Sequence, residues 1–300
     1  MHYKKSINFS LILLTILSIY SCSPDLPKVP PINATPTNEF HPGKFVWWDL
    51  MTDDIASVQK FYSGLFGWTF KNSEEGSADY SVVLQDGVPI AGIFDLKDTK
   101  VEHKYSQWVS YVSVADMSQA INYTKQSGGT IYREPFALPD RGSVAFILDS
   151  QNAVLAFVKS STGDTKDVDP IYDRWMWTEL WTNNIDNSSD FYSELFGYDI
   201  RKFNTSVGNL YYVFQKENKP RAGMLKIPYD NVKPHWMPYI AVKDPAEIVK
   251  KVEELGGTIY LGLDDTGRSD AAIIADPSGA VFTIQKWPLE KGRLNEVKDE

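Results

Sequence analysis

Hydrophobic and polar positions between residues 44 and 160 alternate between strand-like runs and helix-like stretches. Aromatic and branched side chains fill residues 45–51, which predicts a strand. Residues 54–65 carry apolar side chains every three or four positions, which predicts a helix that Gly67 ends. A second helix is predicted over residues 117–126, ended by a Gly-Gly pair. Further strands are predicted at 80–84, 88–94, 108–114, 130–132, 143–148 and 154–158. The class is α+β.

This pattern occurs twice. Residues 61–68 (Phe-Tyr-Ser-Gly-Leu-Phe-Gly-Trp) recur at 191–198, and the Gly-Gly-Thr-Ile-Tyr block at 128–132 recurs at 256–260. Such self-similarity predicts a duplicated module. The further matched pairs are Trp47-x-Asp49-Leu50-x-Thr52 with Trp177-x-Glu179-Leu180-x-Thr182, Pro89-x-Ala91-Gly92 with Pro220-x-Ala222-Gly223, Trp108-x-x-Tyr111 with Trp236-x-x-Tyr239, and Asp149 with Asp276. The predicted domains are 44–160 and 174–288, with a polar linker at 161–173 and a charged tail at 289–300.

The N-terminus has the pattern of an export signal. Two lysines precede an apolar run over residues 7–20, which is shorter than the roughly 20 residues that a membrane-spanning helix needs. Residues 1–21 are therefore predicted to be a signal peptide. The only cysteine, Cys22, follows directly, as in the signals of bacterial lipoproteins. A plain signal peptide with an incidental cysteine is the alternative. Residues 22–43 are proline-rich and are predicted to be a tether without a core.

Composition narrows the functions further. The 300-residue chain carries a formal net charge of −9, which argues against general nucleic-acid binding. One cysteine allows neither an intrachain disulfide nor a cysteine-based zinc site. The aromatic content is high, with 9 Trp, 16 Tyr and 15 Phe, which favours large apolar surfaces in a core or a pocket.

The Phe-Tyr-x-x-Leu-Phe-Gly, Gly-Gly-Thr-Ile-Tyr and Asp-Pro-Ser-Gly-Ala blocks resemble the vicinal oxygen chelate superfamily. This superfamily includes glyoxalase I, bleomycin-resistance proteins and extradiol dioxygenases. The resemblance covers about 240 residues, and it is nearest to bacterial two-domain glyoxalase-like proteins. It implies tandem glyoxalase-like domains built from four βαβββ units, with curved mixed sheets that form cups. Fold alone does not specify an activity, because function depends on the site.

The resemblance also implies positions for metal ligands, on the first and last strands of each unit. In this sequence the corresponding residues are Trp47 and Trp177 on first strands, and Ala156 and Thr283 on last strands. Trp and Ala cannot bind a metal ion, and Thr is a poor neutral donor. No cofactor is therefore expected, and a divalent metal is disfavoured. Glyoxalase and dioxygenase chemistries, which need the ion, are correspondingly in doubt.

Strand alternation places an acid beside a Trp in each cup. Trp47 shares a face with Asp49, and Trp177 shares one with Glu179 and Trp181. Each carboxylate could act as a proton-transfer group or bind a cationic ligand against the aromatic faces. The alternative is architectural, with the carboxylate accepting hydrogen bonds from a neighbouring strand, Arg or Tyr.

Two other features have competing interpretations. Arg141 and Arg268 lie in matched loops and could form an anion clamp, although an ion pair with a nearby Asp is favoured. His235, between Pro234 and Trp236, is a candidate for a catalytic base, and the alternative is a surface or strand-edge histidine.

The expected function is that of an envelope lipoprotein, lipid-anchored to a bacterial membrane with its domain outside the cytoplasm, that binds a small organic molecule without metal. Ligand contacts are expected from Trp47, Asp49, Trp177, Glu179, Trp181 and Thr283. One alternative is an enzyme that uses Asp49 and Glu179 for proton transfer or as atypical metal ligands. Another is a protein-interaction module, and homodimerisation is left open. No nucleic-acid partner is expected.

Overall fold

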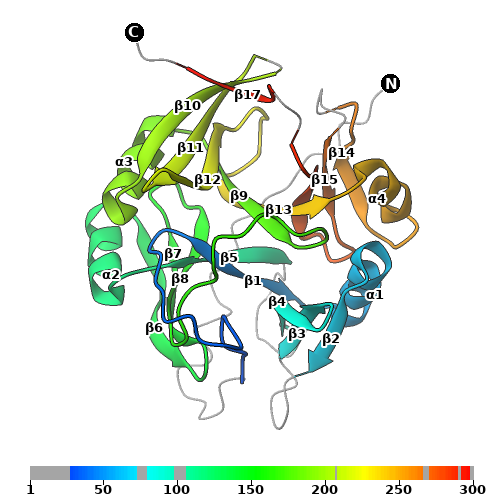
Figure 1. The fold of residues 1–300 in the computed structure, drawn as a ribbon, viewed down its shortest axis with the longest axis horizontal. Helices are drawn as coiled ribbons and strands as arrows, with labels where there is room; N and C mark the ends of the chain where they lie inside the picture. Colours follow the sequence, from blue (N-terminus) through cyan, green and yellow to red (C-terminus); the bar gives the residue numbers. More distant parts are fainter. Residues whose placement is uncertain are drawn as a thin grey trace.

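Each copy of the repeat folds into one mixed sheet that carries two helices (Figure 1). The computed structural model describes residues 28–72, 80–97, 106–206, 208–265, 270–289 and 292–297. The first copy contains β1 (Phe45–Thr52), α1 (Ile55–Phe66), β2 (Thr69–Asn72), β3 (Tyr80–Gln85), β4 (Val88–Asp95), β5 (Gln107–Ser113), α2 (Met117–Gln126), β6 (Thr130–Leu138), β7 (Gly142–Leu148) and β8 (Val154–Ser160).

The second copy repeats this order and adds a short strand near its C-terminal end. Its elements are β9 (Trp175–Thr182), α3 (Ile185–Phe196), β10 (Asp199–Thr205), β11 (Leu210–Lys216), β12 (Lys219–Lys226), β13 (His235–Val242), α4 (Pro245–Val252), β14 (Thr258–Leu261), β15 (Ala271–Ala275), β16 (Val281–Lys286) and β17 (Leu294–Glu296). The α+β class and the arrangement in four βαβββ units are confirmed.

Local chemistry sets the helix ends as the sequence predicts. The side chain of Asp54 accepts a hydrogen bond from the backbone N–H of Ser57 at 3.1 Å, which caps the start of α1. Gly67 ends this helix in the left-handed conformation, with φ at 67°. A residue with a Cβ is disfavoured there, which explains why glycine recurs at position 197 with φ at 68°.

Three strands differ from the prediction. The sequence analysis leaves β2 and β10 as connections and ends β6 at residue 132, whereas β6 continues to Leu138. Most side chains of β2 and β10 are exposed or only partly buried, so their sequences lack the apolar alternation that marks a half-buried strand. Pairing with neighbouring strands, and not side-chain burial, forms β2 and β10.

The strand order places the first strands of the two units in each copy at the centre of the sheet. In the first copy β1 runs antiparallel to β5, and the last strands β4 and β8 lie parallel to β1 and β5 on their outer sides. The second sheet has the same arrangement around β9 and β13. Side chains at alternate positions of these central strands therefore point into the cup of their own sheet.

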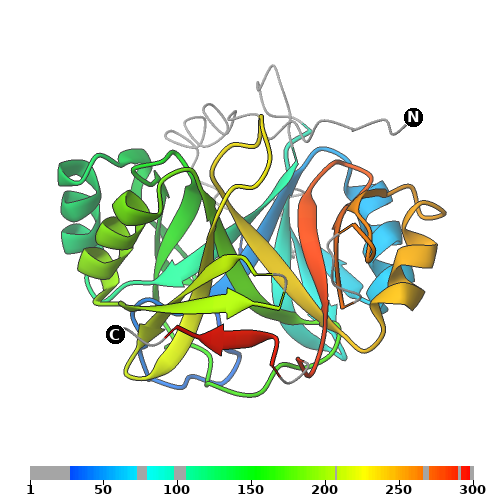
Figure 2. The ribbon, with the colours of Figure 1, turned by 90° about the horizontal axis from the view of Figure 1, so that it is seen from above.

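The opposite faces of the two sheets, with their helices, form a core that both copies share. One cluster joins Val112 and Phe157 of the first copy to Phe191 and Phe214 of the second, and another joins Phe61 to Phe282. As a result α1 lies beside α4, and α2 beside α3, at opposite sides of the molecule (Figure 2). The two copies therefore share one hydrophobic core and are not separate domains joined only by a linker.

Two reciprocal hydrogen bonds lock the copies together. Tyr62 donates to Asp276 at 3.0 Å, and Tyr192 donates to Asp149 at 2.7 Å, so each copy supplies one phenol and one carboxylate. All four side chains are buried. Burial raises the pKa of both carboxyl groups to about 6, although the hydrogen bonds that they accept oppose this shift. The repeated Phe-Tyr and Asp motifs are therefore explained by packing between the copies.

The N-terminal segment requires a correction. Residues 22–43 are predicted to be a tether, yet the part described by the structure is docked, and its side chains Val29 and Ile32 lie in the first cup. Val29 and Ile32 are only 2% and 5% exposed, and they cluster with Leu138 and Val144 of β6 and β7. Proline-rich composition lowers the entropy cost of such docking, and the two branched side chains between the prolines provide apolar surface to bury.

The signal-peptide prediction and Cys22 lie outside the described residues. In the part of the chain that the structure describes, no helix combines the length and apolar character needed to cross a bilayer.

Candidate functional site

The predicted site residues gather in the two cups, and the cups differ. Asp49 lies at the floor of the first cup with both oxygens occupied. Its Oδ1 accepts hydrogen bonds from Trp47 Nε1 and the Tyr80 hydroxyl, each at 2.8 Å. Its Oδ2 accepts from Arg141 NH1 at 3.1 Å. The Asp49 side chain is 0% exposed, so nothing dissolved in water reaches it.

Arg141 closes the first cup. Its guanidinium is also 0% exposed, lies 4.2 Å from the centre of the Trp47 ring, and donates to Tyr80 and to the Pro30 carbonyl. Desolvation disfavours the charged form of Arg141, but Tyr80 and Asp49 outweigh it and raise its pKa. Of the two interpretations of Arg141, the ion pair with an Asp is the one in the structure. The same geometry makes Asp49 an architectural group and not one that is placed to meet a ligand.

Glu179 holds the matching position in the second cup, and no described residue pairs with it as Arg141 pairs with Asp49. Its Oε1 accepts from Trp181 Nε1 at 2.9 Å and from the Tyr239 hydroxyl at 2.7 Å. Glu179 is 4% exposed, and no Lys, Arg or His in the described part of the chain forms an ion pair with it. Arg268, the repeat counterpart of Arg141, lies outside the described residues.

The second cup is also less filled. Trp177 and Tyr211 are half-buried, whereas their counterparts Trp47 and Tyr80 are at most 2% exposed. Trp177 donates to the Tyr211 hydroxyl at 2.9 Å. Trp181 stacks on Tyr229, which is 40% exposed, with ring centres 6.1 Å apart. The second cup therefore presents aromatic surface that is partly open to solvent.

Thr283 also faces this cup, from β16. Its residue is 1% exposed, and its hydroxyl oxygen has no hydrogen-bond partner among the described residues. A buried hydroxyl without a partner loses its hydration at a cost, which a ligand with a donor or acceptor would offset. Ala156, at the corresponding place in the first cup, is fully buried and carries no such group.

Two titratable groups complete the second cup. Burial, and then the charge of Glu179, raise the pKa of Tyr211 well above its ordinary value, so this phenol stays a hydrogen-bond donor at neutral pH. Burial lowers the pKa of His235 to about 4, and its Nδ1 pairs with the Lys233 carbonyl at 2.7 Å. His235 is therefore neutral and weakly basic at neutral pH, which disfavours its role as a general base.

Sequence reasoning placed the Trp and acidic residues in the cups but missed Tyr80, which donates to Asp49, and Tyr211, which accepts from Trp177. Tyr80 and Tyr211 match at the offset that also relates Pro89 to Pro220, so this signal was present in the repeat. Gly92 and Gly223, in the repeated Pro-x-Ala-Gly motif, leave room for these two tyrosine side chains. A Cβ on either glycine would collide with the hydroxyl of the tyrosine that approaches the carboxylate.

Comparisons with known proteins agree with this fold. Residues 174–284 match the model of the Glyoxalase/Bleomycin resistance protein/Dioxygenase superfamily. The chain is 26% identical over 254 residues to a protein of Mycobacterium tuberculosis named as a glyoxylase, CFP32, which covers 83% of this chain and 97% of that protein. It is 28% identical over 259 residues to the anthracycline biosynthesis protein DnrV of Streptomyces peucetius, covering 82% and 94%.

Solved structures extend the comparison of folds. The Mn(II)-bound glyoxalase from Novosphingobium aromaticivorans aligns with a TM-score of 0.55 at 11% identity, covering 86% of this chain and 84% of that one. Homoprotocatechuate 2,3-dioxygenase from Arthrobacter globiformis aligns with a TM-score of 0.52 at 13% identity, covering 90% and 84%. At these identities the likeness concerns the fold alone.

The described residues do not supply the ligands for a divalent ion such as the Mn(II) of the glyoxalase from Novosphingobium aromaticivorans. Among the described residues no group of three or more His, Cys, Asp or Glu side chains is placed to hold an ion. The first cup offers one carboxylate, already bound by Arg141, and the second offers one carboxylate among indoles and phenols. A divalent ion needs several converging oxygen, nitrogen or thiolate ligands. We therefore derive no step through a metal.

Proposed function

Because this chain belongs to the glyoxalase, bleomycin-resistance protein and dioxygenase superfamily, we propose that it binds a small organic molecule in its second cup without a metal ion. The contrast between the two matched carboxylates carries the proposal. Arg141 neutralises Asp49 and closes the first cup, whereas Glu179 has no cationic partner in the described part of the chain and lies below partly exposed aromatic rings. The polar groups of the first cup are therefore used up by packing, whereas the second cup has a carboxylate and aromatic rings that could bind a ligand.

The proposed ligand has a cationic or strongly hydrogen-bond-donating group on an aromatic body. Glu179 would accept from that group, while the faces of Trp177 and Trp181 would cover the flat part and attract the positive charge. The Thr283 hydroxyl would select a further polar atom. A flat aromatic ligand is in keeping with the name of the relative from anthracycline biosynthesis.

An enzymatic role is the second candidate, and it now rests on Glu179 alone. A carboxylate at the floor of a cup could accept a proton from a bound substrate, and Tyr211 and Tyr239 could donate hydrogen bonds to a developing negative charge. The buried ion pair with Arg141 removes Asp49 from this role. Binding without turnover favours the first proposal, and turnover that Glu179→Gln abolishes favours the second.

Tryptamine and 3-methylindole test the binding proposal, because they share an indole and differ in the ammonium group. We expect saturable binding of tryptamine by calorimetry, weakened about tenfold or more in Glu179→Gln, since a charge-assisted hydrogen bond is replaced by a neutral one. Binding of 3-methylindole should change less than twofold. Glu254→Gln, which alters an exposed carboxylate, is the control. The assignment of Glu179 would be refuted if tryptamine showed no saturable binding. It would also be refuted if Glu179→Gln and the control Glu254→Gln bound tryptamine with equal affinity.

We also propose that the protein is an envelope lipoprotein anchored through Cys22. The short apolar run before this single cysteine supports the proposal. Cys22→Ser should shift the protein from the membrane fraction to the soluble fraction of the expressing bacterium, and metabolic labelling with a fatty acid should be lost. A processed Cys22→Ser chain that stays with the membrane would contradict the anchor.

A further inference from the structure

A large cavity lies between the two copies and reaches Trp47 and Trp177, which also belong to the two cups. Its volume is about 1110 Å³, which is enough for a drug-sized molecule. Its walls come from repeat-related segments, namely the starts of β1 and β9 and the starts of β4 and β12. Residues 30–35 and the linker at 165–171 complete the lining. Only the joining of two copies creates this space.

The cavity is positively charged in a chain that is negatively charged overall. Its lining carries more basic than acidic side chains, whereas the whole chain has a formal charge of −9. A cavity with one sign of charge concentrates ligands of the opposite sign. The basic side chains are Lys44, Lys166, Arg174, Lys219 and Arg221, and the acidic ones are Asp167 and Asp169.

One carboxylate of the linker already uses three of these cations. Asp167 lies 2.8 Å from Lys44 Nζ, 2.9 Å from Lys219 Nζ and 2.7 Å from Arg221 NH1. Burial opposes ionisation of Asp167, but the hydrogen bonds from Arg221, Lys219 and Lys44 prevail and lower its pKa well below its usual range. The chain's own acid therefore demonstrates that this end of the cavity stabilises an anion.

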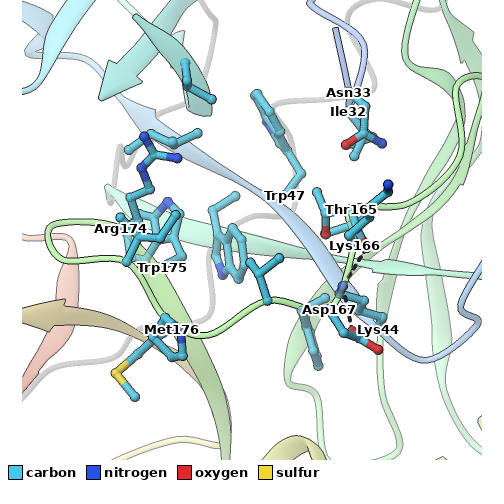
Figure 3. A pocket seen from close by; sticks show the side chains of 18 of the residues that line it. Ile32, Asn33, Lys44, Trp47, Thr165, Lys166, Asp167, Arg174, Trp175 and Met176 are labelled. Atoms are coloured by element: carbon cyan, nitrogen blue, oxygen red, sulfur yellow. Dashed lines mark hydrogen bonds and ion pairs between the residues drawn. The ribbon is translucent and has the colours of Figure 1, made fainter. Parts of the chain in front are cut away.

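Arg174 lies on the opposite side of the cavity from Lys44 and Asp167 (Figure 3). Its NH2 donates to the Gln85 carbonyl at 3.1 Å, and its Nε has no hydrogen-bond partner among the described residues. No carboxylate in that part of the chain forms an ion pair with Arg174. A guanidinium held by one backbone carbonyl keeps donors for a carboxylate or sulfonate.

Apolar side chains gather at the same cavity. Val88 is 46% exposed, Ile171 is 47% exposed and Val168 is 71% exposed, and all three line it. Trp47 and Trp175, on the first strands of the two copies, also line the cavity (Figure 3). Single exposed apolar side chains scattered over a surface are normal. Several that converge on one cavity indicate a binding surface.

We propose that this cavity is a second ligand site, which binds an organic anion with an apolar or aromatic body, and that Arg174 holds the anionic group. Val88, Val168 and Ile171 cover the apolar part. The site borders the proposed site at Glu179, with which it shares Trp177, but it selects the opposite charge.

The test uses two probes that share a skeleton, 8-anilinonaphthalene-1-sulfonate and neutral N-phenyl-1-naphthylamine, with the full chain. We expect both to bind saturably with enhanced fluorescence. Arg174→Gln should weaken the sulfonate probe about tenfold or more and the neutral probe less than twofold, and Arg174→Lys should restore most of the affinity. Arg201→Gln, on the half-exposed Arg201 of β10, is the control.

A second pair of variants tests the apolar wall. Ile171→Ser should weaken both probes severalfold, whereas Leu210→Ser, at a residue that is 52% exposed and does not line the cavity, should weaken neither. Near-ultraviolet circular dichroism confirms that each variant is folded. The proposal fails if Arg174→Gln leaves sulfonate binding unchanged, if it weakens both probes equally, or if Glu179→Gln and not Arg174→Gln weakens the sulfonate probe.

Discussion

The two matched carboxylates give the sharpest test of the structure, because the same chemical change has different consequences in the two cups. Asp49→Asn keeps Oδ1 for Trp47 and Tyr80, but it places an amide NH2 against the NH1 group of Arg141. Both side chains of this ion pair are 0% exposed. The substitution therefore leaves a buried guanidinium without its counter-charge, which costs about 3–5 kcal/mol. For a folded body of this size, that lowers the melting temperature by roughly 6–20 °C.

Glu179→Gln should cost much less. The amide retains Oε1 for Trp181 and Tyr239, and no cation in the described part of the chain loses a partner. Two charge-assisted hydrogen bonds become neutral ones, and relief of the carboxylate's desolvation offsets part of that loss. We expect a cost of about 1 kcal/mol or less, which is roughly 2–4 °C.

Urea unfolding followed by tryptophan fluorescence, together with calorimetry, measures both variants at pH 7. Arg141→Met should destabilise as much as Asp49→Asn, and the double variant should cost clearly less than the sum because the two side chains are in contact. If Asp49→Asn costs no more than Glu179→Gln, the first cup is not closed by a strong ion pair. The contrast on which the proposed function rests would then be wrong.

Two further predictions concern stability. Asp149 and Asp276 have pKa values of about 6 in the fold, against an ordinary value of 3.8, so between these values the folded chain binds more protons than the unfolded chain. Stability should therefore decrease as pH rises from about 4 to about 6, by roughly 2–3 kcal/mol per carboxylate, and Asp149→Asn with Asp276→Asn should flatten this slope in urea titrations. A slope that is unchanged in the double variant would show that other groups dominate. Ile32→Ala should cost about 2 kcal/mol, because Ile32 is 5% exposed inside the first cup, whereas Ile171→Ala, at a side chain that is 47% exposed, should cost less than about 0.5 kcal/mol. Equal and small effects would mean that the N-terminal segment does not occupy the cup in solution.

The amino-acid sequence by itself determined the duplication, the α+β class and most of the elements, because these depend on local spacing. Apolar residues at helical intervals with Asp54 and Gly67 at the ends specify α1 whatever the tertiary context. Strand alternation likewise predicted that Trp47 lies beside Asp49 and Trp181 beside Glu179, and in the structure each indole donates a hydrogen bond to that carboxylate.

Only the tertiary structure decided what those residues do. Arg141 reaches Asp49 across 92 positions, and Tyr62 reaches Asp276 across 214, and no local pattern encodes such distances. Repeat-matched residues then acquire different environments, because Val29 and Ile32 pack into the first cup, whereas no residue of this N-terminal segment is in the described cluster of the second cup. The cavity between the copies has the same origin. Its wall residues are unremarkable in sequence, and they converge only because two sheets pack around a shared core.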